Sequence, residues 1–273
     1  MIIKTKLFAI LGCPINHSFS PKMYNQWFKK EKLNCIYLAF EPNIKHFKQV
    51  LLSLNFLGFS GFNITIPYKI EVIKYLDVID NTVKKIGSVN TVCIKNNKLY
   101  GYNTDWKGFV DDLNDKNIIL KNKNILVFGA GGAARAILYA LKGLKANKIC
   151  IVNRTYKNAV NLAKKFNVGS VNLQETKDVF VSVDLLINCS SCGMNTKDVF
   201  PFKIDKFKRS LIIYDLIYNK STPFVKFARS NGVKIFTGEG MLVCQGACSF
   251  KIWTGIYPNV KITKKIFENS SIR

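Results

Sequence analysis

The sequence predicts an α/β fold divided into two domains, and three observations lead to that prediction. Short apolar runs bounded by turn residues alternate with helical patterns along the chain. A glycine-rich turn after residue 128 joins one of these runs directly to an amphipathic helix. A chain of 273 residues lies in the range where one hydrophobic core stops growing and chains begin to divide. Because 48% of the residues are hydrophobic and only 21% are charged, an intrinsically disordered chain is excluded.

The apolar runs are interpreted as strands in the order in which they occur. The first, 7–11, is too short for a secretory signal and runs straight into Pro14, so we interpret it as a buried strand. Six further runs are expected to be strands: 36–40, 61–66, 125–128, 149–152, 185–188 and 211–215. No run approaches the roughly 18 apolar residues needed to span a bilayer, so no membrane association is expected. The polar stretch 114–124 is the best candidate for a domain boundary.

The charge balance is the unusual feature of the composition. The net charge of +24 suggests an acidic partner such as nucleic acid, a membrane surface or a phosphorylated small molecule. Residues 119–237 carry 16 Lys and 4 Arg against 6 acidic residues, so more than half of the excess lies there. The lysines are dispersed, and bidentate phosphate or base recognition favours Arg over Lys. We therefore expect a solvated basic surface and no specific nucleic acid, although a basic nucleic-acid-binding protein with a Rossmann scaffold stays open as the non-enzymatic alternative.

Eight cysteines are scattered through the chain, several of them inside apolar runs. A chain of this size needs no disulfides for stability, so reduced thiols and a cytoplasmic location are expected. Two close pairs, Cys189 with Cys192 and Cys244 with Cys248, could form a redox or zinc site. With only two histidines in the chain to support a metal, we expect none.

Residues 125–141 form an apolar strand, a glycine turn and an amphipathic helix in immediate succession. The turn fits the pattern G-x-G-x-x-A: Gly129 permits the sharp bend, Gly131 lets a pyrophosphate approach the backbone, and Ala134 lets helix and strand pack closely. The helix N-terminus then faces the anion. The predicted dinucleotide-binding residues of this loop are Gly129, Ala130, Gly131, Gly132 and Ala133.

The residues after the second strand of this domain discriminate between the two nicotinamide cofactors. An NAD site usually places Asp or Glu here, whereas this chain has Asn153, Arg154 and Thr155, followed by Lys157. A carboxylate would repel a 2'-phosphate, and Arg154 would attract it. The sequence therefore predicts NADP, with Arg154 and Thr155 on the phosphate and Asn153 near the ribose.

Polar clusters interrupt the apolar strands of the first segment. Ser18 and Ser20 precede a helix expected to begin at Pro21, where hydroxyls either cap the helix or bind a carboxylate. Asn63 and Thr65 point to one face of their strand, and Lys69 follows in a short loop. The stretches 87–92 and 101–105 add further amide, hydroxyl and carboxylate groups. Four such clusters in one domain indicate a pocket for a polyol or a hydroxy acid.

These motifs together resemble the shikimate dehydrogenase family, NADP-dependent enzymes of aromatic amino-acid biosynthesis. The resemblance runs from the first strand almost to the C-terminus and includes the stretches 188–194, 215–218 and 240–245. It implies a two-domain α/β fold with a cleft between the domains and the reversible NADPH-dependent reduction of 3-dehydroshikimate to shikimate. Because Gln245 would have to reach the substrate pocket, residues 1–118 completed by 238–273 are expected to form the substrate domain, and 119–237 the Rossmann domain.

The resemblance also assigns roles to individual residues. Lys69 and Asp105 correspond to the catalytic pair, with Lys69 delivering the proton as hydride arrives. Ser18, Ser20 and Tyr218 would hold the substrate carboxylate. Asn63, Thr65, Asn90, Asp105 and Gln245 would line the ring hydroxyls. Gly240 and Met241 would adjoin the cofactor, with Met241 flanking the nicotinamide.

Three residues depart from the family pattern: Ser88, Trp106 and Glu239. They put the shape of the pocket in doubt without removing a group that the reaction needs. The alternative within the enzyme class is a quinate or dual quinate/shikimate dehydrogenase. The presence of Arg154 instead of an acidic residue after the second Rossmann strand argues against this alternative. The partner is expected to be a small-molecule substrate, and the oligomeric state stays open between monomer and homodimer.

Overall fold

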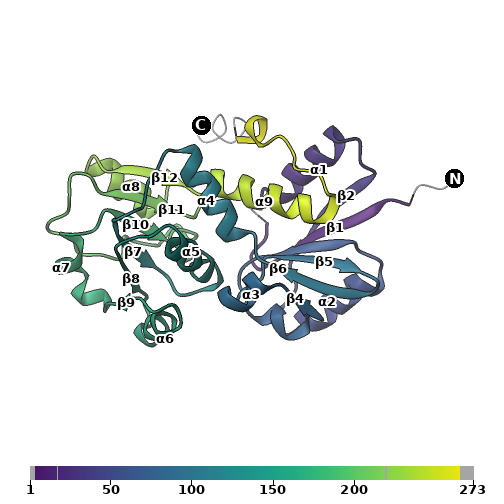
Figure 1. Cartoon of the computed structure of the whole chain (residues 1–273), viewed down its shortest axis with the longest axis horizontal. Coiled ribbons are helices and arrows are strands. Elements are labelled where there is room, and N and C mark those ends of the chain that lie inside the picture. The colour runs from purple at the N-terminus through teal and green to yellow at the C-terminus, as the bar shows by residue number, and fades with distance from the viewer. Residues whose placement is uncertain (1–3, 17, 219, 265–273) are drawn as a thin grey trace. The chain divides into compact units, whose positions relative to one another are not determined.

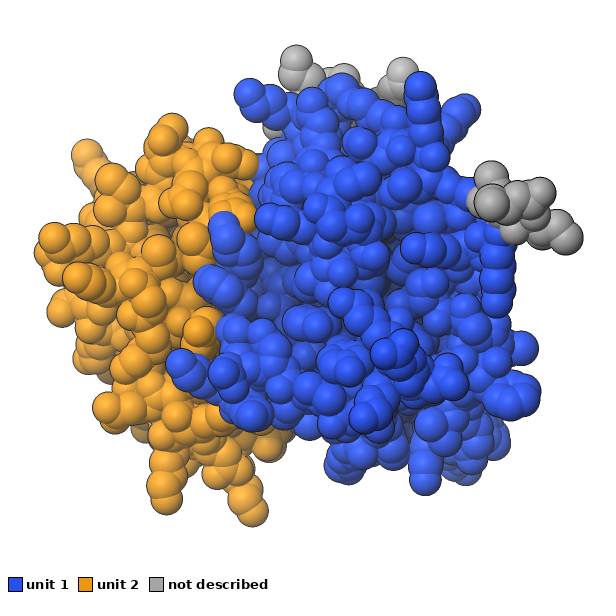
Figure 2. All heavy atoms as spheres, turned by 45° about the vertical axis from the view of Figure 1, so that its right-hand side comes forward, with its two compact units in different colours: residues 1–108, 243–265 blue, residues 109–242, 266–273 orange. Residues whose placement is uncertain are grey.

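The computed structural model describes residues 4–16, 18–218 and 220–264 (Figure 1). The chain divides into two compact units, coloured separately in Figure 2. Unit 1 comprises Met1–Gly108 and Val243–Lys265, and unit 2 comprises Phe109–Leu242 and Ile266–Arg273. Of the tail expected in the substrate domain, residues 265–273 lie outside the described residues. Within the described residues, the chain passes from one unit to the other inside two helices, α4 (Asp105–Asp115) and α9 (Glu239–Thr254).

Unit 1 contains a mixed six-stranded sheet in the order β2-β1-β3-β5-β6-β4. Its strands are β1 (Lys6–Leu11), β2 (Cys35–Phe40), β3 (Gly61–Ile64), β4 (Val78–Ile79), β5 (Thr91–Lys95) and β6 (Lys98–Tyr102). Strand β1 runs parallel to β2 and β3, whereas β5 is antiparallel to both β3 and β6. The β5–β6 hairpin turns through Asn96 and Asn97, whose φ values of 50° and 57° fit a two-residue turn that matches the twist of the strands.

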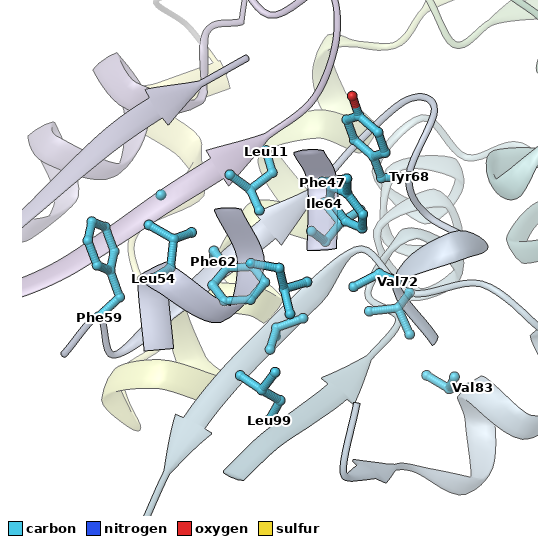
Figure 3. Packing of buried hydrophobic residues seen from close by; sticks show 14 residues of the cluster. Leu11, Phe47, Leu54, Phe59, Phe62, Ile64, Tyr68, Val72, Val83 and Leu99 are labelled. Carbon is cyan, nitrogen blue, oxygen red and sulfur yellow. The ribbon is translucent and has the colours of Figure 1, made fainter. Parts of the chain in front are cut away.

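Alternation along the strands divides the side chains of this sheet between two faces. One face packs against α2 (Phe47–Phe56), α3 (Asn81–Ile86) and the 3-10 turn η2 (Glu71–Tyr75), and a second 3-10 turn, η1 (Ile44–His46), leads into α2. Figure 3 shows the buried cluster on this face, which includes Leu11, Phe62 and Leu54. Phe62 and Ile64 belong to this cluster, so Asn63 between them points to the opposite face.

The opposite face of the sheet is covered by α1 (Ser20–Lys30) and the C-terminal part of α9. Aromatic rings join these elements, since the Phe8 ring lies 5.3 Å from that of Phe28 and 4.9 Å from that of Trp253. Gly61 is needed here because a Cβ on it would come within 2.5 Å of the Trp253 indole nitrogen. Helix α9 therefore lies close against the sheet face to which Asn63 points.

Unit 2 contains a six-stranded sheet in the order β12-β11-β10-β7-β8-β9, with every pairing parallel. Its strands are β7 (Asn124–Phe128), β8 (Lys148–Val152), β9 (Gly169–Ser170), β10 (Leu185–Asn188), β11 (Ile212–Asp215) and β12 (Lys234–Thr237). The intervening helices are α5 (Gly132–Gly143), α6 (Tyr156–Phe166), α7 (Thr176–Phe180) and α8 (Pro223–Ser230), and a 3-10 turn η3 (Leu173–Glu175) precedes α7.

Numbered from β7, the strand order of this sheet is 3-2-1-4-5-6, the arrangement of dinucleotide-binding domains. The order reverses between β7 and β10, and ligands of such sheets bind outside the carboxyl ends of the strands at this point. The connection from β10 to β11 is a long segment rather than a helix, anchored by Phe200 and Phe202 against Phe224 of α8.

Candidate active site

A lysine–carboxylate pair lies at the centre of the predicted site in unit 1. Lys69 follows β3 and Asp105 opens α4, and the Lys69 Nζ donates to Asp105 Oδ2 at 2.6 Å. The two side chains are only 14% and 6% exposed. The second carboxylate oxygen accepts a hydrogen bond from Asn90 Nδ2 at 2.8 Å. Because both oxygens have donors, the carboxylate is held in one orientation and holds the ammonium in turn.

Three predicted amide residues meet beside this pair. The Asn63 Nδ2 donates to the main-chain oxygen of Asn90 at 3.0 Å. The Asn90 Nδ2 also donates to Gln245 Oε1 at 3.1 Å. All three side chains are buried, although Gln245 is separated from Asn90 by 155 residues. The fold thus brings Asn63, Lys69, Asn90, Asp105 and Gln245 into one connected group.

The two serines predicted to bind the substrate carboxylate lie at the start of α1. The Ser18 Oγ accepts from the backbone N–H of Ser20 at 3.3 Å, and Ser20 is buried. The N-cap of α1 is Phe19, which makes no side-chain capping hydrogen bond, so neither serine occupies the N-cap position. Thr65 follows β3, which ends at Ile64, two residues before the predicted end, although the backbone N–H of Thr65 still donates to the main-chain oxygen of Leu11 at 2.9 Å. A Cβ on Gly12 would come within 2.2 Å of Thr65 Cγ2, so Thr65 adjoins the end of β1.

Four further buried residues make hydrogen bonds to the predicted site residues: Tyr37, Thr91, Thr104 and Ser249. Thr91 and Thr104 lie in the polar stretches 87–92 and 101–105, whose hydroxyl groups were predicted to belong to the pocket. Tyr37 and Ser249 were missed by sequence reasoning, and of these two only Ser249 had an available signal, because it lies four residues after Gln245 on the same helical face. Ser88, one of the departures from the family pattern, accepts from Asn103 Nδ2 at 3.1 Å and thereby supports the loop before Asp105.

The predicted dinucleotide loop of unit 2 lies at the reversal point of the sheet. Gly129 has φ +113°, and a Cβ on it would come within 2.9 Å of the Cys189 carbonyl carbon and the Ser190 nitrogen. Only glycine therefore lets the ends of β7 and β10 approach this closely. A Cβ on Gly131, by contrast, would have no protein atom within 4 Å, so the absent side chain leaves open space at the start of α5. Ala130, Gly132 and Ala133 complete this loop and the first turn of the helix.

This arrangement fits a dinucleotide. Main-chain N–H groups at the N-terminus of α5, a helix of 12 residues, are suited to a pyrophosphate, and Gly131 leaves the room that it needs.

The residues predicted to select the cofactor lie between β8 and α6. Asn153 Nδ2 donates to the main-chain oxygen of Thr155 at 3.0 Å, which shapes the turn. Arg154, Thr155 and Lys157 are exposed, and Thr155 is the N-cap of α6 without making a side-chain capping bond. Two cations and a hydroxyl are thus presented together at a helix N-terminus, a combination that suits a phosphate.

The remaining predicted residues of unit 2 lie after β11 and at the start of α9. Tyr218 is half-buried, whereas Met241 is 6% exposed. Gly240 packs against α4, since a Cβ on it would overlap the carboxylate of Asp112. Asp112 in turn accepts from the hydroxyl of Tyr214 at 2.5 Å. Sequence reasoning gave no indication of this packing of Gly240 against Asp112.

Asp215, at the end of β11, organises the loops around Tyr218. Its carboxylate accepts from Asn188 Nδ2 at 2.8 Å and from Thr222 Oγ1 at 2.6 Å. Burial raises the pKa of this carboxyl to about 6, against the lowering effect of its hydrogen bonds, and the charge of Glu239 adds to the rise. Glu239, another departure from the family pattern, therefore acts on a buried carboxyl of the same unit.

All eight cysteines are free thiols. Burial, followed by the charges of Asp198 and Asp215, raises the pKa of Cys192 to about 11, so this thiol stays protonated at neutral pH. Within the described part of the chain, no group of three or more His, Cys, Asp or Glu side chains is placed to hold a metal ion. In the same residues, no helix has the length and apolar character required to cross a membrane.

The fold and the two groups of residues define a class of protein: a nicotinamide-dinucleotide-dependent dehydrogenase with a Rossmann unit and a separate α/β unit that carries a lysine–carboxylate pair. The chain belongs to the shikimate dehydrogenase family. Family models match residues 10–92 (shikimate dehydrogenase substrate binding domain), 112–209 (shikimate / quinate 5-dehydrogenase) and 238–266 (shikimate 5'-dehydrogenase C-terminal domain).

Individual relatives agree with this assignment. The chain is 44% identical to the shikimate dehydrogenase (NADP(+)) of Methanococcus aeolicus, over 96% of each chain. It superposes on the crystal structure of shikimate dehydrogenase from Aquifex aeolicus with a TM-score of 0.91 and 38% identity, covering 100% of this chain and 99% of that one. The enzyme from Thermus thermophilus, solved in complex with NADP(H) and shikimate, gives a TM-score of 0.87 and 31% identity, covering 97% of this chain and 100% of the other.

Proposed function

We propose that this protein is an NADP-dependent shikimate dehydrogenase, which catalyses the reversible reduction of 3-dehydroshikimate to shikimate. The observation that carries the proposal is the Lys69–Asp105 pair, 2.6 Å apart and connected to a buried group of amide side chains. A ketone reductase needs one proton donor beside a set of groups that recognise hydroxyls, and this group of residues supplies both.

The cofactor of this reaction is NADP(H), which supplies or accepts the hydride when it is bound. The loop Gly129–Ala133 and the N-terminus of α5 hold its pyrophosphate, and Arg154, Thr155 and Lys157 hold the 2'-phosphate. Asn153 lies near the ribose, and Gly240 and Met241 adjoin the nicotinamide. The open space at Gly131 and the exposed cations after β8 support these assignments.

Lys69 acts as the acid in the direction of ketone reduction. Negative charge builds up on the substrate oxygen as the carbonyl is reduced, and the ammonium of Lys69 stabilises that charge and transfers a proton from Nζ. Asp105 holds the ammonium in position, and Asn90 holds the carboxylate. In the reverse direction, neutral Lys69 accepts the proton of the shikimate hydroxyl.

The remaining polar residues recognise the substrate. Asn63, Thr65, Asn90, Asp105 and Gln245 bind the ring hydroxyls, and Ser18, Ser20 and Tyr218 bind the carboxylate. Amide and hydroxyl groups whose positions are set by internal hydrogen bonds suit this task because they lose little entropy on binding. On this assignment the residues for the ring hydroxyls all belong to unit 1, whereas the cofactor residues and Tyr218 belong to unit 2. The eight free thiols support a cytoplasmic location.

A spectrophotometric assay of cofactor reduction tests the proposal. NADP and NAD are each combined with shikimate and with quinate, and the appearance of reduced cofactor is followed. We expect turnover with NADP and shikimate and much less in the other three mixtures. Turnover with quinate and NAD alone would instead identify a quinate dehydrogenase. Absence of turnover in all four mixtures, together with steeply salt-dependent DNA binding, would favour a nucleic-acid-binding protein.

A further inference from the structure

Ser249 lies at the meeting point of four segments of unit 1 and is 0% exposed. Its Oγ is 2.7 Å from Thr91 Oγ1 on β5 and 3.1 Å from Thr104 Oγ1 in the segment after β6. It accepts from Asn63 Nδ2 on β3 at 3.3 Å. It also donates to the main-chain oxygen of Gln245, one turn earlier on α9, at 3.1 Å. One hydroxyl thus connects α9 to three segments of the sheet.

The side chains that Ser249 contacts continue directly into the predicted substrate ligands. The Gln245 Oε1 lies 3.3 Å from its donor Thr104 Oγ1 and also accepts from Asn90 Nδ2 at 3.1 Å. These two hydrogen bonds hold the amide oxygen of Gln245 toward Asn90 and Thr104, which fixes the orientation of the whole side-chain amide. Because Thr104 contacts both residues, the position of the Ser249 hydroxyl affects the position of the side-chain amide of Gln245.

Asn63 is oriented in a similar way from both of its polar atoms. Its Oδ1 accepts from the hydroxyl of Tyr37 at 2.7 Å, and its Nδ2 donates to Ser249 and to Thr91 Oγ1, the latter at 3.2 Å. Asn63 and Thr91 are directly opposite each other on the antiparallel strands β3 and β5. A side chain without a hydroxyl at position 249 would leave these polar groups facing a hydrocarbon surface, where they lose hydrogen bonds.

We propose that Ser249 is a positioning residue that sets the places of Asn63 and Gln245 for recognition of the substrate's ring hydroxyls. The inference rests on the proposed function, since it assigns a role to the residue beneath the predicted ligands. Full burial keeps Ser249 away from the substrate, so it acts only through the side chains above it. The Lys69–Asp105 pair is held directly by Asn90. Ser249 reaches Asn90 through Thr91 and Thr104, so it lies one contact further from the proton donor.

The test is steady-state kinetics of Ser249→Ala with both substrates. We expect the KM for shikimate to rise about tenfold, the size expected when buried hydrogen-bond partners are left unsatisfied. We expect kcat to change less than about threefold and the KM for NADP to stay unchanged, since the proton donor and unit 2 are untouched. A role in stability alone would lower the melting temperature and the active fraction, and hence kcat, without raising the KM for shikimate.

Thr263→Val is the matched control. It also removes a buried hydroxyl of unit 1, one that accepts a hydrogen bond from Trp27 Nε1 at 2.8 Å and not from a predicted substrate ligand. We expect it to lower the melting temperature and leave both KM values unchanged. Ser249→Cys serves as a second variant with nearly the same shape and a weaker hydrogen-bonding group, and an intermediate KM for shikimate is expected.

The outcomes separate this inference from the proposed function. If the wild-type protein turns over shikimate and both Ser249 variants keep its KM, the positioning role is wrong. Equal increases in the KM for shikimate and for NADP, or an increase with Thr263→Val as well, would also overturn it. If the wild-type protein has no shikimate turnover, the proposed function itself fails.

Discussion

Replacement of Asp215 by Asn should remove a distinct part of the pH dependence of this protein's stability. Asp215 is fully buried, and burial raises the pKa of its carboxyl to about 6 from the ordinary 3.8. The hydrogen bonds from Thr222, the backbone of Ile217 and Asn188 oppose that rise, and the charge of Glu239 adds to it. The ionised form of the Asp215 carboxyl is therefore higher in free energy, relative to its neutral form, in the folded protein than in the unfolded chain.

The sign and the size of the effect follow from the two pKa values. The folded protein binds this proton more tightly, so the contribution to stability is fully present below about pH 3.8 and is lost as the pH rises through about 6. The difference between the two pKa values corresponds to about 3 kcal/mol of unfolding free energy. Asn keeps the size of Asp and two of its acceptor contacts but carries no titrating proton.

The measurement is urea unfolding between about pH 4 and pH 7, followed by circular dichroism. This probe is needed because Trp27, Trp106 and Trp253 all belong to unit 1, whereas Asp215 belongs to unit 2. We expect the unfolding free energy of the wild type to fall by about 2 kcal/mol relative to Asp215→Asn over this range, because at pH 4 the carboxyl of the unfolded chain is already partly ionised. The exposed Asp205→Asn is the control and should follow the wild type. Parallel pH curves for the wild type and Asp215→Asn would refute the reasoning.

Four further predictions concern the proposed reaction and the cofactor-binding residues. Lys69→Ala should lower kcat by about a hundredfold to ten-thousandfold while titration calorimetry shows unchanged NADP affinity, because it removes the proton donor alone; near-wild-type turnover would exclude Lys69 as the acid. Gly129→Ala should lower the unfolding free energy by about 1–3 kcal/mol, since φ is positive and the ends of β7 and β10 must separate. Gly131→Ala should leave stability unchanged and weaken NADP binding, because only the ligand would meet the added methyl group; a stability loss equal to that of Gly129→Ala would contradict this. Arg154→Ala should raise the Kd for NADP about tenfold or more and leave that for NAD nearly unchanged, since a charge-assisted contact to the 2'-phosphate is lost; equal loss for both cofactors would count against its selecting role.

The parts of the fold that the sequence predicted well are those with long apolar runs. The runs 7–11 and 125–128 are strands inside their sheets, where apolar side chains are buried on both faces and leave a clear signal. The run 36–40 is also a strand, although it lies at the edge of its sheet and Ile36 and Leu38 are exposed. The short strands β4 and β9, with two residues each, were missed because so few side chains show no period. The hairpin β5–β6 was also missed, although Asn96 and Asn97 are typical of the turn that joins such strands.

The candidate site likewise has parts that could be predicted from the sequence and parts that could not. The dinucleotide loop was predictable because all of its contributions lie within one strand–turn–helix segment, so adjacency in the chain guarantees adjacency in space. The polar group of unit 1 was predictable only in part. Asn63, Gln245 and the polar stretch that contains Thr104 could be recognised from residue types that suit hydroxyl recognition, but Tyr37, which donates to Asn63, carries no local signal.

The amino-acid sequence by itself determined the class of fold, the glycine loop at 129–133 and the cationic turn at Arg154 that favours NADP, since each depends on neighbours in the chain. The tertiary structure alone decided which polar groups meet. Asn90 and Gln245 are 155 residues apart in sequence and hydrogen-bonded at 3.1 Å. Hydrogen bonds act over about 3 Å and in defined directions, so only the packing of α9 on the sheet could place Ser249 among Asn63, Thr91 and Thr104.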